Sequence, residues 1–286
     1  MKNNHSVSRR KFLQTGIIVS GFLAVASPSP VFAGATKPER DPDDGLKLGI
    51  ASYTFRKFTL DQAIAMTKQT GLKYINLKDT HLPLNSSAAD CVAAAAKIKA
   101  AGLTLMGGGV IYMKNDEHQI RQIFEYARNA GMPMIVCSPE PEALDIVENM
   151  VKEFNLRIAI HNHGPSDKKY PSPLDVLKMV EHRDARMGIC MDVGHTVRLG
   201  QDPVEVISQI KERLYDFHIK DINQPNAKGR DMEVGKGIID IVGIFKEFLA
   251  MKFPGHIGLE YEANGDAPLP GVMESVAYMH GVLAAV

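Results

Sequence analysis

The sequence lacks the features that define several common protein classes. It has only 3 cysteines in 286 residues, an odd number that does not form a disulfide framework. Lys plus Arg equals Asp plus Glu at 33 each, so there is no basic excess of the kind that nucleic-acid-binding proteins carry. No apolar run reaches the roughly 20 residues that a membrane-spanning helix needs. We therefore expect Cys91, Cys137 and Cys190 to be unpaired, with Cys91 and Cys190 as small core residues.

The first 35 residues have the pattern of an export signal. A basic stretch contains the pair Arg9-Arg10, an apolar run covers residues 17–26, and the small-residue sequence Val31-Phe32-Ala33 precedes a cleavage point before Gly34. This order of features predicts a twin-arginine signal peptide over residues 1–35. The alternative, an N-terminal membrane anchor, requires a longer apolar run. We expect recognition by the twin-arginine export machinery, a periplasmic mature protein and no stable membrane anchor.

After a polar, proline-interrupted linker over residues 36–44, short apolar runs alternate eight times with amphipathic stretches. The expected strands cover residues 46–53, 74–78, 103–107, 134–137, 156–161, 187–192, 216–220 and 256–261. The expected helices cover residues 60–70, 88–101, 115–130, 141–154, 173–181, 202–214, 238–253 and 272–283. Apolar strands separated by helices indicate a parallel sheet whose outer face is covered. No glycine-rich dinucleotide fingerprint follows the first strand, which disfavours an open doubly wound sheet. We therefore predict an α/β fold with a single (β/α)8 TIM barrel over residues 45–286.

Four polar residues end consecutive strands of this predicted barrel. They are His161, Asp192, His218 and Glu260, on the fifth to eighth strands. A charged or imidazole group at the end of an apolar strand is costly to bury unless it is paired or bound to a cation. One such residue alone would be explained by hydrogen bonds to loops, whereas four on consecutive strands favour a shared metal ion. Two imidazoles and two carboxylates suit one divalent ion, which leaves Mn, Co, Zn, Fe and Ni open.

At these residues the chain resembles the sugar phosphate isomerase/epimerase superfamily, the xylose isomerase-like TIM barrels. The motifs that carry the resemblance are Asp192-Val-Gly-His195, His218-Ile-Lys-Asp221, Gly235-Lys-Gly237 and Gly258-Leu-Glu260. The resemblance extends from Gly45 to the C-terminus. It implies a metal-dependent enzyme that acts on small carbohydrates.

The resemblance also implies ligands and one departure from them. Epimerases of the superfamily hold the metal with Glu, Asp, His and Glu at the ends of strands five to eight, which match Asp192, His218 and Glu260 at three positions. His161 stands where the family has Glu. Because the two family glutamates act as opposed bases, this exchange puts two-base epimerisation in doubt and leaves the metal site intact.

Further residues are candidates for catalysis and substrate binding. His163 and Glu260 are the candidate bases, with His195 and Lys78 assisting. The resemblance implies that His195 and Lys220 meet the sugar. Lys78 and His81, at the top of the second strand, are candidates to bind hydroxyls or to act as acid and base. Arg230 is either a substrate contact or a loop surface charge. Asp221 is expected to orient Lys220 or a loop.

This set of residues predicts metal-assisted removal of a proton next to a sugar carbonyl, with isomerisation, epimerisation and elimination all open. Export favours unphosphorylated sugars, and β-elimination from 3-keto-glycosides by a periplasmic lyase is the alternative reaction. A non-catalytic sugar-binding barrel is an alternative of another class. The superfamily also contains DNA repair endonucleases. Nucleic-acid binding is disfavoured because the leader holds four basic residues and no acid, which leaves the remaining chain at a net charge of −4. The sequence permits a homo-oligomer.

Overall fold

The structure is a computed structural model, and it describes residues 42–286. The predicted signal peptide and all but the last residues of the predicted linker lie outside the described residues. Within the described part of the chain, no helix has the length and apolar character needed to cross a membrane.

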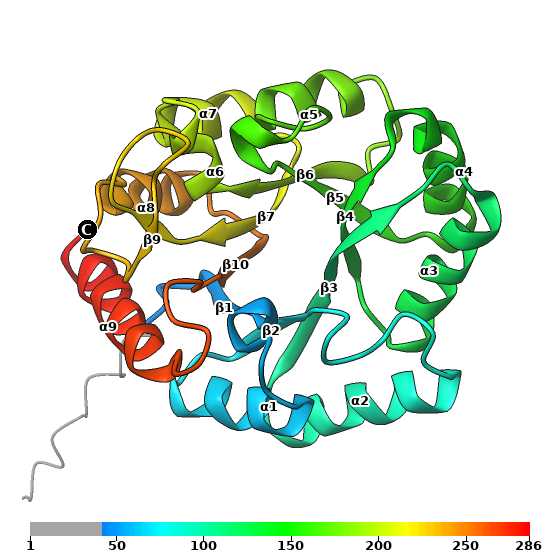
Figure 1. The fold of residues 1–286 in the computed structure, drawn as a ribbon, viewed down its shortest axis with the longest axis horizontal. Coiled ribbons are helices and arrows are strands. Elements are labelled where there is room, and N and C mark those ends of the chain that lie inside the picture. The colour runs from blue at the N-terminus through cyan, green and yellow to red at the C-terminus, as the bar shows by residue number, and fades with distance from the viewer. Residues whose placement is uncertain (1–41) are drawn as a thin grey trace, which may run out of the picture. The chain divides into compact units, whose positions relative to one another are not determined.

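Eight parallel strands close into a barrel, in the order β1-β10-β7-β6-β5-β4-β3-β2 (Figure 1). This confirms the predicted TIM barrel. The barrel strands are β1 (Lys47–Ala51), β2 (Tyr74–Leu77), β3 (Thr104–Met113), β4 (Met134–Pro139), β5 (Arg157–His161), β6 (Met187–Asp192), β7 (Leu214–Ile219) and β10 (His256–Leu259). Neighbouring strands pair in parallel register, for example Asp192 with His218. All eight C-terminal strand ends therefore lie at one mouth of the barrel.

Helices surround this barrel (Figure 1). They are α1 (Leu60–Gln69), α2 (Ala88–Ala100), α3 (Glu117–Asn129), α4 (Leu144–Phe154), α5 (Pro173–Val180), α6 (Val193–Arg198), α7 (Pro203–Ile210), α8 (Ile241–Ala250) and α9 (Leu269–Ala285), with the short 3-10 helices η1 (Ser52–Phe55), η2 (Pro141–Ala143) and η3 (Gly164–Ser166). Local sequence sets several helix starts. Thr59 and Ser87 each form a capping box with the residue three positions on, which satisfies backbone N–H groups in the first turn.

The structure differs from the sequence prediction in several elements. Strand β3 continues past the expected end at residue 107 to Met113. A Cβ atom on Gly107 would lie 2.6 Å from the carbonyl oxygen of Met134, so glycine here permits close approach of two strands rather than ending one. The helix expected over residues 202–214 ends at Ile210. A short helix, α6, and a hairpin of β8 (Asp221–Ile222) and β9 (Asp231–Met232) were not predicted.

The three cysteines are buried and unpaired, as predicted. Cys190 lies inside the barrel, where its thiol is 3.7 Å from Asp216 Oδ1. Burial raises the pKa of Cys137 and of Cys190. None of the three is therefore a ready nucleophile.

Asp221 organises the loop that follows β8. Its buried carboxylate accepts hydrogen bonds from four backbone N–H groups, at distances of 2.9 to 3.1 Å; the donors are Ile222, Gly235, Gly237 and Ile239. The expectation that Asp221 orients a loop is confirmed. Because Asp221 follows Lys220 directly, the same bonds fix the end of β7.

Replacing Asp221 by Ala removes the acceptor of all four N–H groups, of which those of Ile222 and Ile239 are buried, so we expect the free energy of unfolding to fall by roughly 3 kcal/mol. Asp116→Ala is the matched control. Asp116 caps α3 with two N–H bonds at an exposed position, and its loss is expected to cost about 1 kcal/mol. Denaturant unfolding measures both, and an Asp221→Ala loss no larger than that of the control would contradict the assignment.

Candidate metal and substrate site

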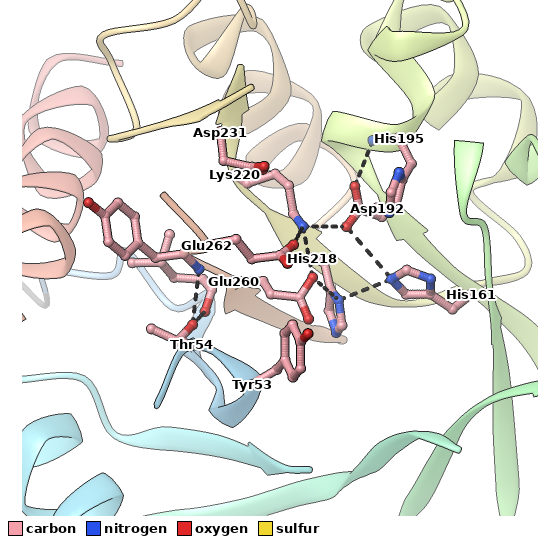
Figure 2. A network of polar contacts seen from close by, with 12 residues as sticks. Tyr53, Thr54, His161, Asp192, His195, His218, Lys220, Asp231, Glu260 and Glu262 are labelled. Carbon is pink, nitrogen blue, oxygen red and sulfur yellow. Dashed lines mark hydrogen bonds and ion pairs between the residues drawn. The ribbon is translucent and has the colours of Figure 1, made fainter. Parts of the chain in front are cut away.

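Four predicted ligands converge at the C-terminal mouth of the barrel (Figure 2). His161 ends β5, Asp192 ends β6, His218 lies in β7 and Glu260 follows β10. One ligand atom from each of the four lies within 4.8 Å of the others, and all four residues are buried. His161 Nε2 is 3.2 Å from His218 Nδ1 and 3.7 Å from Asp192 Oδ2, and His218 Nδ1 is 3.3 Å from Glu260 Oε2.

Backbone hydrogen bonds hold Asp192 in place. Its side chain accepts from the backbone N–H of His195 at 2.7 Å and so caps α6. Its own backbone N–H donates to Asn162 Oδ1 at 2.8 Å. The sequence Asp192-Val-Gly-His195 thus forms a strand end and a helix start at once. This local geometry directs the second carboxylate oxygen toward His161.

Lys220 lies at the centre of a buried ionic network (Figure 2). Its Nζ is 2.9 Å from Asp192 Oδ2, 2.8 Å from Glu260 Oε2 and 2.7 Å from Glu262 Oε1. Burial opposes the charged form of Lys220, but the three carboxylates outweigh it and raise its pKa well above the ordinary value. Lys220 is therefore an ammonium ion held by three carboxylates. To meet a sugar, as the resemblance implies, Lys220 would need a contact in addition to these three ion pairs.

The two imidazoles of the cluster respond in opposite ways to their surroundings. Burial lowers the pKa of His161 to about 3, so its ring is neutral at neutral pH. Burial acts in the same direction on His218, but Glu260, Asp216 and Asp192 outweigh it and raise its pKa to about 9. His218 thus lies where carboxylates attract a positive charge.

The cluster fits a divalent cation on three grounds. Lys220 and its three carboxylates carry a net charge of −2 between them, which one divalent ion neutralises. Ligand atoms about 2.1 Å from such an ion lie roughly 3.0 to 3.4 Å from one another, close to the separations within the cluster. Imidazole and carboxylate donors together suit first-row divalent metals.

A pocket of about 290 Å³ opens directly above this cluster. Its lining comprises Tyr53, Lys78, Val110, Tyr112, His161, His163, His195, Glu260 and Glu262. Five of these residues were predicted from the sequence as ligands or catalytic groups, and the structure brings them to one cavity. Lys78 is tethered there, because its Nζ donates to the carbonyl oxygen of Val110 at 2.7 Å and pairs with Asp79 at 3.0 Å.

His163 and His195 face the pocket as neutral imidazoles. Burial, and then the neighbouring His195, lowers the pKa of His163, and burial also lowers the pKa of His195. The hydroxyl of Tyr112 lies 3.2 Å from His163 Nε2, and Asp167 Oδ2 lies 3.3 Å from His163 Nδ1. A neutral imidazole has one free lone pair, so either ring is able to accept a proton.

The structure places two other predicted substrate contacts away from the pocket. His81 is buried, with Nε2 3.1 Å from the carbonyl oxygen of Phe55 and Nδ1 2.8 Å from Ser52 Oγ. A carbonyl only accepts, so Nε2 carries the proton and both nitrogens are occupied. His81 therefore supports η1 rather than binding substrate, which corrects the expectation. Arg230 is exposed in the loop between β8 and β9 and does not line the pocket.

Sequence reasoning missed Tyr53, Tyr112 and Glu262. Tyr53 belongs to η1, directly after β1, and the Arg56 guanidinium stacks 4.8 Å from the centre of its ring. Glu262 follows Glu260 by two residues, and that alternation was a signal that it faces the same side. Tyr112 had no such signal, because its place depends on the unpredicted length of β3.

Comparison with known protein families and curated relatives agrees with this geometry. A family model described as "Xylose isomerase-like TIM barrel" matches residues 60–280. The inosose dehydratase of Lacticaseibacillus casei is 21% identical over 180 residues, a match that covers 57% of this chain and 60% of that protein. The inosose dehydratase of Clostridium perfringens is 25% identical over 183 residues, with the same two coverages. The matched region is thus less than two thirds of the length of these relatives.

Solved structures share the fold over most of the chain. An uncharacterised protein from Parabacteroides distasonis is 26% identical, covers 82% of this chain and 98% of its own, and superposes with a TM-score of 0.65. The 3-keto-D-glucoside 4-epimerase from E. coli is 16% identical, covers 82% of this chain and 99% of its own, and has a TM-score of 0.67. At that identity the second likeness shows the fold alone.

We expect chelator-treated protein to bind one divalent cation per chain. His218→Gln and Asp192→Asn each remove a ligand and are expected to weaken binding at least 100-fold, since the remaining groups no longer surround the ion. Titration calorimetry with Mn(II), Co(II) and Zn(II) measures this. His182→Gln, at an exposed histidine, is the control. Equal affinity in His218→Gln and in the control would rule out the cluster as the binding site.

Proposed function

Because the chain belongs to the xylose isomerase-like TIM barrel family, we propose that it is a divalent-metal-dependent enzyme that removes a proton from the carbon next to a sugar carbonyl. The observation that carries the proposal is the convergence of His161, Asp192, His218 and Glu260 beneath a pocket that also holds neutral imidazoles. Enolisation requires metal ligands and a proton acceptor in the same pocket, and this site has both.

His161, Asp192, His218 and Glu260 would hold the metal. When bound there, a divalent cation lowers the pKa of a C–H bond next to a carbonyl and stabilises the negative charge that develops on the oxygens. Lys220 contributes a fixed positive charge beside Asp192 and Glu260. Because Lys220 is buried and held by three carboxylates, it orients these groups without reorganising during the reaction.

Proton transfer falls to groups on two sides of the pocket. Glu260 follows β10 and His163 follows β5. In the barrel, strands β7 and β6 lie between β10 and β5. Burial opposes the charge on Glu260, yet Lys220 and His218 hold its pKa well below the usual range, so it is ionised and weakly basic. His163 is neutral and more basic than Glu260, and its Nε2 lies 3.2 Å from the hydroxyl of Tyr112, which also lines the pocket. We assign His163 as the stronger candidate base, with Glu260 second and His195 and Lys78 assisting.

The residue at position 161 supports elimination as a second candidate outcome. Epimerisation by two opposed bases uses a carboxylate on each face of the substrate, and here the β5 side offers imidazoles only. Elimination needs one base and one proton donor, and the Tyr112 hydroxyl and the Lys78 ammonium are donors in the same pocket. The curated relatives carry the name inosose dehydratase, and a dehydratase eliminates water from its substrate. Their name supports elimination as the second candidate reaction. A lyase acting on keto-glycosides is therefore the alternative to an isomerase or epimerase.

In deuterated water, the metal-loaded enzyme is expected to exchange the α-hydrogen of a keto-sugar or keto-glycoside. His163→Asn is expected to slow the exchange by about 100-fold or more, because the base is lost. Glu274→Gln, at an exposed glutamate paired with Lys236, is the control. Product NMR reads the deuterium and, for elimination, the new alkene signal. No exchange and no alkene across a keto-sugar and keto-glycoside panel would exclude this class of reaction.

The twin-arginine motif supports a periplasmic location. We expect full-length protein in a bacterium with that export route to be recovered in the periplasmic fraction, and the Arg9→Lys, Arg10→Lys double variant to stay in the cytoplasm. Immunoblots of the two fractions measure the difference. Identical distribution of wild type and double variant would contradict export by this route.

A further inference from the structure

Tyr112 differs from every other exposed apolar residue in the described part of the chain. Residues 42–286 contain eight exposed large hydrophobic side chains, and Tyr112, at 59% exposure, is the one among them that lines the pocket above the cluster. Strand β3 has ten residues and carries Tyr112 near its end, opposite Ser138 of β4. An aromatic face is thus presented to solvent at the mouth of a polar site.

The ring of Tyr112 is held in position rather than free. Its hydroxyl is 3.2 Å from His163 Nε2, and its ring stacks on the His163 imidazole with centroids 5.7 Å apart and planes 26° from parallel. Asp167 Oδ2 lies 3.3 Å from His163 Nδ1, on the other side of the imidazole. Because Tyr112 is anchored at its hydroxyl and 59% of the residue is exposed, its ring is available to a ligand. A face that is already ordered loses little entropy when a ligand covers it.

The pocket therefore has two levels of different chemistry. The floor is buried and ionic: His161 is 2% exposed and Asp192 is fully buried. Tyr112 lines the same pocket and is 59% exposed, so its aromatic ring lies on the solvent side of that floor. A keto-sugar has hydroxyls and a carbonyl for the floor. The aromatic mouth suits a second ring, because aromatic faces bind apolar ring faces and exposed apolar area of this kind often marks a binding site.

The charges of the lining residues limit which kind of group can bind beside Tyr112. Glu260 and Glu262 present carboxylates to the pocket, and the Lys78 ammonium already contacts the carbonyl oxygen of Val110 and Asp79. A phosphate at the mouth would meet these carboxylates without an unengaged cation among the lining residues. The lining therefore disfavours a phosphate or another anionic group at this position.

We propose that Tyr112 forms an outer subsite that binds the ring of an aglycone, so that the natural substrate is a keto-glycoside rather than a free keto-sugar. The inference rests on the proposed function for the identity of the inner sugar. The aromatic contact itself depends only on the ring, its anchoring by His163 and its position at the pocket mouth.

Equilibrium binding to matched methyl and phenyl glycosides of glucose, galactose and xylose tests the subsite. These probes carry no ketone, so binding is measured without turnover, by calorimetry on metal-loaded protein. For at least one sugar, wild type is expected to bind the phenyl glycoside roughly 3- to 10-fold more tightly than the methyl glycoside. Tyr112→Ala is expected to bring that ratio close to one, whereas Tyr112→Phe keeps most of it because the ring remains. Tyr278→Ala, at an exposed tyrosine of α9 outside this pocket, leaves the ratio unchanged.

Two readouts separate failure of the subsite from failure of the proposed function. The subsite is overturned if no phenyl glycoside is preferred by wild type, if none binds, or if Tyr112→Ala keeps the preference while its circular dichroism and melting temperature match wild type. Deuterium exchange into a free keto-sugar by the wild-type protein reports on the inner site alone, because that substrate carries no aglycone. A wild type that shows the phenyl preference but no exchange with any substrate would sustain the subsite and reject the proposed reaction.

Discussion

The ammonium of Lys220 and the three carboxylates around it set the electrostatics of the whole barrel mouth. Buried Asp192 and Glu260 and half-buried Glu262 each lie within hydrogen-bonding distance of the Lys220 ammonium, and the remaining charge of −2 has to be balanced. His218 shows the same imbalance, because its pKa rises although burial alone would lower it. A divalent cation held by His161, Asp192, His218 and Glu260 would balance this charge. The barrel supplies the rigid strand ends that make this convergence possible.

The resemblance implies a glutamate where this chain has His161, and we propose that this exchange affects proton transfer rather than the position of the metal. Imidazole is a good ligand for first-row divalent metals, so metal binding is preserved. A neutral ligand in place of an anion also lowers the negative charge of the cluster, which reduces the cost of burying Asp192 and Glu260 close together. The loss falls on proton transfer, because the β5 side of the pocket then depends on His163, which Tyr112 and Asp167 orient.

Much of the fold and the ligand set could be predicted from the sequence, for a physical reason. A polar group at the end of an apolar strand is expensive to bury, so His161, Asp192, His218 and Glu260 stood out against Val, Ile and Leu. The rest depends on contacts between distant segments. Lys220 reads as a surface or substrate-binding lysine until the strand register brings Glu262 to it. His81 reads as a site residue until Ser52 and Phe55 occupy both of its nitrogens. Tyr112 lies beyond the glycines at 107–109. The predicted strand ended there, whereas β3 continues through them to Met113.

Anomalous X-ray diffraction tests the metal centre most directly. Crystals of protein purified without chelator, measured above and below the absorption edge of the metal found by elemental analysis, should give one anomalous peak per chain. That peak should lie about 2.1 Å from His161 Nε2, Asp192 Oδ2, His218 Nδ1 and Glu260 Oε2. Crystals soaked with Mn(II), Co(II) or Zn(II) that show no anomalous peak there, with Lys220 still bridging the carboxylates, would contradict a metal centre at this site.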